Sequence, residues 1–287
     1  LHTPLTTHCL LRRRKAAVIT QLPAKRRQRV VLQLDARDAR PLRAIEDQLG
    51  KLDAAASDWD RRQNLSAQVV ELGAAKAIRA AEYAIELLPS AGKLLFFGHH
   101  KSMLDAMEAA AAKAKVRCLR IDGSTPGAER QALVKTFQAL PDATDAIFVL
   151  SILAAGQGLT LTNAHTVVFG ELRWVPGELL QAEDRAHRIG QQSAVNCHYC
   201  IAEGTVDEAM WRMLQRKVRS LGRTLDGAAA QLKAPQTQWR SASQGDGDDD
   251  ADGDGPGGAE EAAALAEEAA AEDALELVAL RERRRRE

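Results

Sequence analysis

Two arginines three residues apart form the most informative pattern in the chain. They lie in the segment Gln-Ala-Glu-Asp-Arg-Ala-His-Arg-Ile-Gly-Gln, which begins at Gln181 and contains Asp184, Arg185 and Arg188. On a helix, residues three apart project from the same face. Two guanidinium groups aimed at one point suit the charge that spreads over phosphoryl oxygens in phosphoryl transfer. A solvated helix with an Asp–Arg pair has the same pattern and is the better interpretation of a D-R-x-x-R motif taken alone.

A second pattern precedes the arginines. Small residues and glycines lie between Ser151 and Thr162, directly after an apolar run. Because Gly156 and Gly158 have no side chain, backbone N–H groups there can approach a phosphate or ribose closely. An ordinary glycine turn has the same composition. The two segments together, followed by Glu-Leu-Arg-Trp-Val-Pro-Gly from Glu171, are more specific than either one alone.

The surrounding sequence predicts the elements that position these residues. Short apolar or β-branched runs predict buried strands, and amphipathic stretches predict helices between them. The expected strands are 94–97, 116–121, 146–150, 166–169 and 195–201, and the expected helices are 102–115, 126–140, 177–188 and 205–220. Strands separated by helices require right-handed crossovers, so we expect an α/β fold with a parallel sheet and helices on both faces. Ligands of such sheets bind beyond the carboxyl ends of the strands, where we expect both segments to lie.

These motifs resemble the second RecA-like lobe of SNF2-type ATP-dependent DNA translocases, within helicase superfamily 2. The resemblance runs from about residue 11 to residue 221 and is greatest to the HARP-type annealing helicases. It rests on Phe-Gly-His-His-Lys-Ser-Met-Leu-Asp from Phe97, on Ile-Asp-Gly-Ser-Thr from Ile121 and on the segment from Gln181. Arg-Ile-Gly-Gln at Arg188 replaces the Arg-x-Gly-Arg of DEAD-box RNA helicases. The resemblance implies a RecA-like fold for this region.

The resemblance also implies a nucleotide site that this chain only completes. Arg185 and Arg188 match the arginine fingers that reach ATP, which is bound with Mg mainly by the other lobe. Gln181 and Asp184 match residues at the same interlobe cleft. These four residues are therefore expected to contact nucleotide from the second side of the cleft.

Five further residues match positions that concern DNA. Gly156 and Gly158 match the loop that couples the nucleotide to DNA, and Lys101, Ser151 and Trp174 match positions near the tracked strand. Phosphate contacts would make such binding salt-dependent and largely independent of sequence. Trp174 has two interpretations, a DNA contact or a residue that packs within the protein.

The half of the motor that would bind ATP has no counterpart in this sequence. It contains no G-x-x-x-x-G-K-[ST] P-loop, and Asp-Glu-Ala-Met at Asp207 lacks the His of a D-E-x-H box. We therefore expect this chain alone not to hydrolyse ATP. It begins at Leu1 without a signal-peptide pattern, and we expect either a fragment of a longer protein or a truncated product.

Charge is unevenly distributed along the chain. The 39 Lys+Arg and 39 Asp+Glu residues cancel, but residues 245–287 hold 15 acids and five bases. The remaining 34 bases and 24 acids make a basic body, which favours a polyanion partner; ordinary solubility is the other interpretation. Four cysteines are too few for a disulfide framework, and Cys197 and Cys200 lack a second ligand pair, so no metal site is predicted. No apolar stretch is long enough to span a membrane.

Composition divides the chain into five parts. We assign 1–37 to the end of the first motor lobe and its connector, 38–92 to a helical linker and 93–221 to the helicase C-terminal RecA-like lobe. Residues 222–258 are predicted to be a disordered linker, and 259–287 an Ala/Glu-rich helix with a basic end. An EF-hand-like spacing that starts at Asp250 is interpreted as a chance match within an Asp/Gly run.

The function predicted from these features is that of the second motor lobe of a nuclear DNA translocase or annealing helicase. It is expected to act on DNA duplexes, forks or single-strand junctions. The expected partners are DNA, a P-loop lobe, and single-stranded-DNA-binding or chromatin proteins, with no membrane. The alternative is a degenerate, non-catalytic module that binds histones or chromatin through its acidic tail. A P-loop and a D-E-x-H box upstream of Leu1 in the same reading frame would favour the motor.

Overall fold

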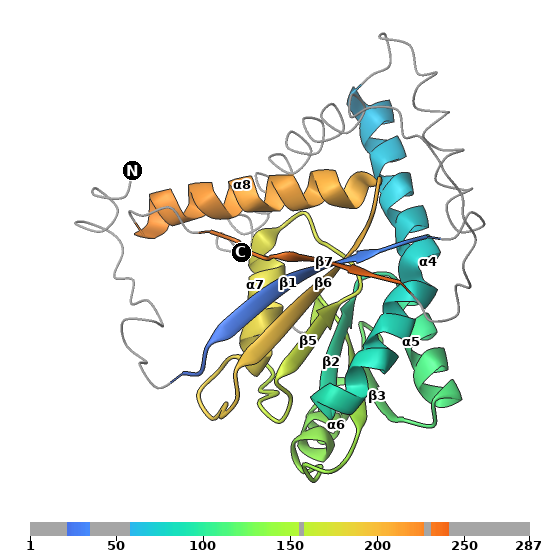
Figure 1. Cartoon of the computed structure of the whole chain (residues 1–287), viewed down its shortest axis with the longest axis vertical. Coiled ribbons are helices and arrows are strands. Elements are labelled where there is room, and N and C mark those ends of the chain that lie inside the picture. The colour runs from blue at the N-terminus through green and yellow to red at the C-terminus, as the bar shows by residue number, and fades with distance from the viewer. Residues whose placement is uncertain (1–21, 35–57, 155–157, 227–230, 241–287) are drawn as a thin grey trace, which may run out of the picture.

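A seven-stranded sheet runs through the computed structural model of this protein (Figure 1). The structure describes residues 22–34, 58–154, 158–226 and 231–240. The strand order is β3-β4-β2-β5-β6-β1-β7, and every neighbouring pair is parallel. The strands are β1 Lys25–Leu32, β2 Lys93–Gly98, β3 Arg117–Ile121, β4 Ala146–Ser151, β5 Thr166–Phe169, β6 Val195–Ala202 and β7 Gln236–Trp239.

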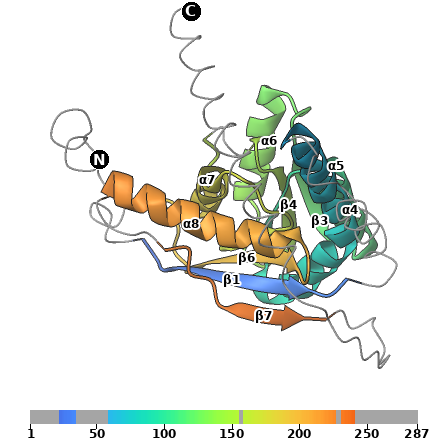
Figure 2. The ribbon, with the colours of Figure 1, turned by 90° about the horizontal axis from the view of Figure 1, so that it is seen from above.

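Helices cover both faces of this sheet, as Figure 2 shows. They are α4 Asp58–Ala91, α5 Lys101–Lys113, α6 Gly127–Gln138, α7 Pro176–Ala186 and α8 Val206–Asp226. Side chains of β2 alternate between two cores: Leu94 and Phe96 pack with residues of α4 and α5, and Leu95 and Phe97 pack with residues of α6, α7 and α8. All six residues of β2 are buried, as expected for a central parallel strand. The predicted RecA-like α/β fold is confirmed.

Two strands that the sequence analysis missed extend the sheet beyond residues 93–221. β1, within the predicted connector, pairs with β6, and β7 pairs with β1 on its other side. The prediction of a disordered linker over 222–258 is therefore wrong at Gln236–Trp239, because this polar segment hydrogen-bonds to the edge of the sheet. The predicted Asp/Gly linker beyond residue 240 and the Ala/Glu-rich helix lie outside the described residues.

The helix α4, predicted as part of a linker, packs directly on the sheet. Its buried side is lined by small residues, and alanine lets a helix approach its neighbours closely. These residues are Ala77, Ala80, Ala81 and Ala84, all at most 3% exposed. α4 also lies beside α5, so these two helices form one continuous layer (Figure 1).

Candidate functional site

The arginine segment lies at the end of α7. The helix ends at Ala186, and His187 leaves it with φ −86° and ψ 75°. The Nε2 atom of His187 donates a hydrogen bond to the Pro23 carbonyl oxygen at 2.8 Å, which fixes this exit from the helix. The expected helix over 177–188 is therefore too long. Arg185 lies in the last helical turn, but Arg188 lies in the turn that follows.

Arg188 contacts the glycine-containing segment after β4. Its Nη1 atom donates to the carbonyl oxygen of Gly158 and to Oγ1 of Thr160, both at 3.4 Å. Arg188 and Gly158 are exposed, and Gly158 adopts a φ of 78°, which a glycine tolerates without strain. Nearby, the backbone N–H of Leu161 donates to the carbonyl oxygen of Arg185 at 2.9 Å. The fold thus brings together the two segments that the sequence singled out, while Gly156 lies outside the described residues.

This contact lies near the amino ends of the strands, which we call the amino edge. After β5 the chain must return to the amino end of the next parallel strand, so α7 runs opposite to the strands. Gln191 confirms the position, because its Nε2 donates to the carbonyl oxygens of Thr162 and Ala164 just before β5, at 3.2 and 2.9 Å. The expectation that the arginines lie at the carboxyl ends of the strands is wrong.

A buried carboxylate holds α7 in this position. Glu183 is completely buried, and Arg27 of β1 binds it through two hydrogen bonds, Nε to Oε1 at 2.5 Å and Nη2 to Oε2 at 2.8 Å. Lys25 Nζ lies 2.7 Å from Oε2, and the Tyr199 hydroxyl of β6 donates to Oε1 at 2.6 Å. A buried charge is tolerated only with partners of this kind. We call Lys25, Arg27, Glu183 and Tyr199 the clamp.

The clamp shifts the titration of its members. Burial alone would raise the pKa of Glu183, but the hydrogen bond from Arg27 and the charges of Lys25 and Arg27 hold that pKa below its usual value. Burial would lower the pKa of Arg27, but Glu183 outweighs it and raises that pKa. Glu183 is therefore ionised near neutral pH and ties α7 to β1.

The residues predicted for the interlobe cleft lie on the outer part of α7. Gln181 is exposed, and the Asp184 side chain, 37% exposed, lies 3.3 Å from Lys25 Nζ. Burial, followed by the charge of Arg188, lowers the pKa of the half-buried Arg185, with Asp184 opposing the shift. The end of α7 thus carries an excess of positive charge.

The opposite edge, where β2, β4 and β5 end, is organised by a different carboxylate; we call it the carboxyl edge. Glu171, which follows β5, is 4% exposed and accepts hydrogen bonds from the backbone N–H groups of His99 and His100 at 2.5 and 2.9 Å. His100 Nδ1 lies 2.5 Å from its other oxygen. Burial would raise the pKa of Glu171, but these contacts with the two histidines lower it. Glu171 thus fixes the loop that leads into Lys101, the exposed first residue of α5.

The residues predicted to lie near DNA are all at the carboxyl edge. Lys101 is exposed, whereas Ser151, the last residue of β4, is only 8% exposed. Trp174 is half-buried and packs against the core, and its carbonyl oxygen accepts a hydrogen bond from Lys217 Nζ at 3.2 Å. The contacts of Trp174 favour the packing interpretation, while part of its surface stays accessible.

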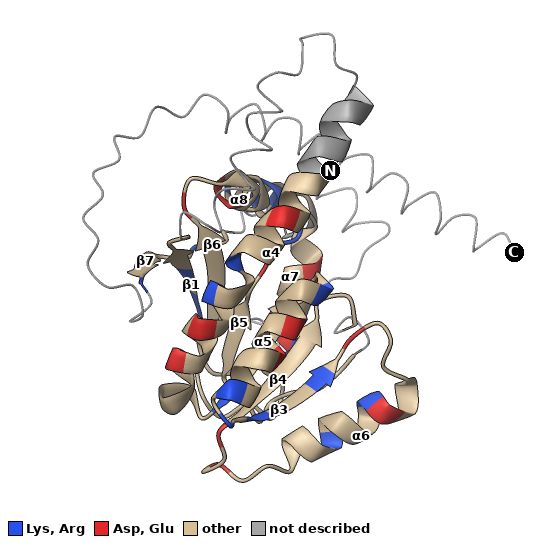
Figure 3. Ribbon diagram, turned by 90° about the vertical axis from the view of Figure 1, so that its right-hand side faces the viewer, with Lys and Arg blue, Asp and Glu red and all other residues tan. Residues whose placement is uncertain are grey.

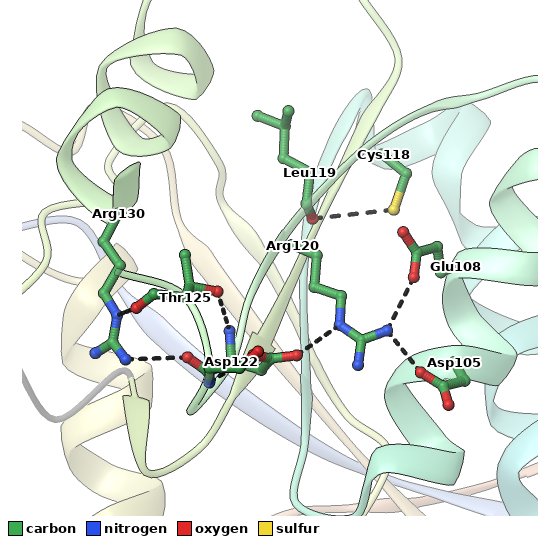
Figure 4. A network of polar contacts seen from close by, with 9 residues as sticks. Asp105, Glu108, Cys118, Leu119, Arg120, Asp122, Thr125 and Arg130 are labelled. Carbon is green, nitrogen blue, oxygen red and sulfur yellow. Dashed lines mark hydrogen bonds and ion pairs between the residues drawn. The ribbon is translucent and has the colours of Figure 1, made fainter. Parts of the chain in front are cut away.

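The Ile-Asp-Gly-Ser-Thr motif forms a turn held by its own aspartate (Figure 4). Asp122 accepts hydrogen bonds from the Ser124 backbone N–H at 2.9 Å and hydroxyl at 2.6 Å, and from Arg120 Nε at 3.0 Å. The hydrogen bonds from Ser124 lower the pKa of Asp122 to about 2, with a further contribution from Arg120. Arg120 also binds Asp105 and Glu108 of α5. The Asp122 carboxylate is therefore engaged within the protein.

The described part of the chain was also compared with what a metal cluster and a membrane-spanning helix require. Among those residues, no group of three His, Cys, Asp or Glu side chains could hold a metal ion. Cys197 and Cys200 are buried free thiols, and Cys118 is a half-buried one. None of the described helices combines the length and apolar character that crossing a membrane requires.

Sequence reasoning missed the residues that hold the two edges in place. Lys25 and Arg27 alternate along a strand, but their charges hid the strand pattern, which is apolar only from Val30 onward. Glu183 lies in the segment that begins at Gln181, and Glu171 begins the Glu-Leu-Arg-Trp-Val-Pro-Gly segment. The sequence does not show, however, that these two side chains are buried. The apolar signal in β1 is limited to Val30, Val31 and Leu32, which is too short a run to predict a strand by itself.

Comparison with known proteins identifies the family to which this lobe is similar. Residues 79–190 match the family described as the helicase conserved C-terminal domain. The chain is 45% identical over 246 residues to the "DNA annealing helicase and endonuclease ZRANB3" of Mus musculus, covering 81% of this chain and 22% of that protein. It is 42% identical over 217 residues to the "SWI/SNF-related matrix-associated actin-dependent regulator of chromatin subfamily A-like protein 1" of Xenopus laevis, covering 74% of this chain and 22% of that protein.

A solved structure supports the fold. The "C-terminal part of Fun30 ATPase domain" superposes with a TM-score of 0.55 at 19% identity, covering 68% of this chain and 90% of that one. The sheet, its helices and the arginine segment therefore define the C-terminal RecA-like lobe of a superfamily 2 helicase. Within that class, the chain belongs to the SNF2 family and is similar to its HARP-type annealing helicases. It spans about a fifth of the length of the relatives named above, 22% in each case.

Proposed function

We propose that this chain is the second motor lobe of a nuclear, SNF2-type DNA-dependent ATPase that acts on duplexes or forks. ATP with Mg would bridge it to a P-loop lobe. The observation that carries the proposal is the contact of the exposed Arg188 with Gly158 and Thr160, next to Arg185. The likeness to a mouse protein named as a DNA annealing helicase supports the choice of substrate.

The positively charged end of α7 suits the binding of a negatively charged triphosphate. Bound ATP with Mg would supply the phosphoryl group that is transferred to water. Arg185 and Arg188 repel each other, as the lowered pKa of Arg185 reflects after the larger effect of burial. Phosphoryl oxygens placed between them would relieve that repulsion and would accept hydrogen bonds from both guanidinium groups. Gln181 and Asp184 would orient the same ligand from the exposed side of α7.

The segment between β4 and β5 supports coupling between nucleotide and DNA. It leaves Ser151 at the carboxyl edge and reaches Gly158 beside Arg188 at the amino edge. A shift of Arg188 toward nucleotide would therefore displace a segment whose other end lies near Lys101. DNA would bind at the carboxyl edge through phosphate contacts, which steer position without reading sequence.

Substitution of Arg188 by Ala in the two-lobed protein tests this proposal. Because fingers supplied from a second domain contribute about 10³-fold or more, DNA-stimulated ATP hydrolysis should fall by at least that factor while DNA binding persists. Arg117→Ala, which removes an exposed arginine of β3, is the matched control and should retain activity. A loss below about tenfold for Arg188→Ala would reject the finger assignment and favour a non-catalytic interaction module.

A further inference from the structure

The outer face of α8 carries four exposed arginines. Arg212, Arg216, Arg219 and Arg223 follow one another at intervals of four, three and four residues, so they share one side of the helix. We call them the basic face. The opposite side of α8 is buried and consists of Ala209, Met210, Trp211, Met213, Leu214 and Val218. The core thus fixes the orientation of α8 and with it the outward direction of the arginines.

This charge pattern is unfavourable for the helix itself. Like charges four residues apart, as in the pairs Arg212/Arg216 and Arg219/Arg223, destabilise a helix. Of the two acids in the first turn, Asp207 is buried against Lys76, and Glu208, four residues before Arg212, can offset the charge of that first arginine alone. On α4 and α5, by contrast, acidic and basic residues are mixed along the helix (Figure 3). The helix dipole favours a cation in the last turn, which accounts for Arg223 but not for Arg212 and Arg216.

Three of the four arginines of the basic face form no ion pair with another described residue. None of the ion pairs formed among the described residues involves Arg212, Arg219 or Arg223. α8 starts just after β6 ends, at the carboxyl edge, and Lys217 attaches it to the Trp174 carbonyl oxygen at 3.2 Å. The basic face therefore starts next to the surface proposed to hold DNA.

We propose that the basic face binds the phosphodiester backbone of the DNA held at the carboxyl edge, an inference that rests on the proposed function. A guanidinium group donates paired hydrogen bonds to phosphate oxygens and keeps its charge at any physiological pH. From Arg212 to Arg223 the helix rises about 16 Å, which matches about five phosphates along one strand. The contact reads no bases, so it adds affinity for any DNA sequence.

Salt dependence of DNA binding tests the basic face. The 287-residue chain and its triple variant Arg212→Gln, Arg219→Gln, Arg223→Gln would be titrated against labelled duplex DNA by fluorescence anisotropy. Glutamine keeps helix propensity and polarity while it removes charge. The slope of log K against log salt is negative, and each lost phosphate contact reduces its magnitude by about 0.9. Three lost contacts therefore reduce it by about 2.7. Between 50 and 200 mM salt, the affinity of the unmodified chain should then fall about 40-fold more than that of the variant.

A second triple variant controls for net charge. Lys113→Gln, Arg117→Gln and Lys135→Gln remove three exposed cations from α5, β3 and α6 and should leave the slope nearly unchanged. Equal changes in the two triple variants would overturn the proposal. It would also be overturned if the α8 variant bound DNA as tightly as the unmodified chain, or more tightly, because the acidic segment 245–287 would then be the better candidate for covering this face.

Lys101→Gln separates this inference from the proposed function. A loss of DNA affinity in Lys101→Gln together with an unchanged α8 variant would reject the basic face and leave the proposed function standing. Absence of binding by the unmodified chain at 50 mM salt would reject the basic face and DNA binding by this lobe together. Thermal melts of each variant exclude unfolding as the cause of any change.

Discussion

The two edges of the sheet are each organised by one buried glutamate, but the partners of the two glutamates differ. At the amino edge, Glu183 pairs with two cations of β1, a segment more than 150 positions away in the sequence. At the carboxyl edge, Glu171 binds two backbone N–H groups and one imidazole of a nearby loop. Charge pairing therefore secures a helix over a long sequence separation, and hydrogen bonds to the backbone shape a loop.

This difference predicts how much stability the protein loses when either glutamate is removed. A cation buried against Glu183 is left uncompensated when the acid is removed, which is costly in a medium of low dielectric constant. The backbone N–H groups that donate hydrogen bonds to Glu171 are neutral and lie close to the surface. When the glutamate is removed, water can therefore replace part of its hydrogen bonding. Removal of Glu183 should therefore lower the free energy of unfolding more than removal of Glu171.

The largest effect is expected for Glu183→Ala. It leaves Lys25 and Arg27 without their carboxylate and should lower the free energy of unfolding by about 3–5 kcal/mol. Asp184→Ala, one residue along, removes a partly exposed ion pair and should cost about 1 kcal/mol or less. Urea denaturation of both variants measures the contrast. Equal losses would show that the clamp does not hold α7.

A smaller loss is expected for Glu171→Ala. It removes hydrogen bonds to His99, His100 and the His100 imidazole, and should cost about 2–3 kcal/mol. Glu171→Gln keeps one carbonyl oxygen as an acceptor for the backbone N–H groups and should cost clearly less. Stability of the two variants, measured under the same conditions as for Glu183→Ala, provides the comparison. A glutamine variant as unstable as the alanine variant would show that the charge, and not the hydrogen bonds, shapes this loop.

Gly73→Ala tests the same edge from the side of α4. A Cβ atom at Gly73 would collide with Glu171 Oε1, and relieving the overlap should cost about 1–3 kcal/mol. The same substitution made in Glu171→Ala should cost much less, because the colliding atoms are gone. A double-mutant cycle measures this coupling. If the losses of stability of the two single variants simply add in the double variant, the cost of alanine at position 73 does not come from contact with the Glu171 carboxylate.

The sequence predicted the central strands of the sheet well, for a physical reason. Strands such as β2 and β4 are buried on both faces, so their residues form short apolar runs that periodicity detects. β1 begins with charged residues because they pair with Glu183, and β7 is a polar edge strand. Neither has the pattern of a buried strand, and both were therefore missed.

The candidate site was predicted in composition but not in position. The motifs singled out Arg188 and Gly158, which the fold brings into contact, while their roles toward nucleotide and DNA stay predictions. Sequence spacing could not show that the helix ends at Ala186, since the exit depends on a hydrogen bond from His187 to Pro23, far away in the chain. The edge that holds the arginines, by contrast, follows from the predicted order of strand, helix and parallel strand, because the helix between β5 and β6 must run back to the amino ends of the strands. A long-range contact therefore decided where the helix ends, but not at which edge it ends.

The smallest effect concerns pH and distinguishes the two edges again. Burial, helped by the charges of Arg173 and His100, lowers the pKa of His99 from 6.5 to about 4. Below pH 6.5 the unfolded chain therefore binds a proton that the folded protein does not, and the free energy of unfolding falls as the pH falls toward 4. Because His99 is only partly buried, the loss between pH 7.5 and pH 5.5 should be about 1 kcal/mol or less.

His99→Asn removes this proton and should flatten that part of the pH profile. Glu183 should contribute nothing over the same interval, because its pKa is held below its usual value and the carboxylate stays ionised throughout. Urea denaturation at pH 7.5 and 5.5 compares the two proteins, and an NMR titration of His99 reads its pKa directly. A His99 resonance that titrates near 6.5, or an Asn variant with an unchanged pH profile, would place the acid sensitivity elsewhere and leave the two edges alike in this respect.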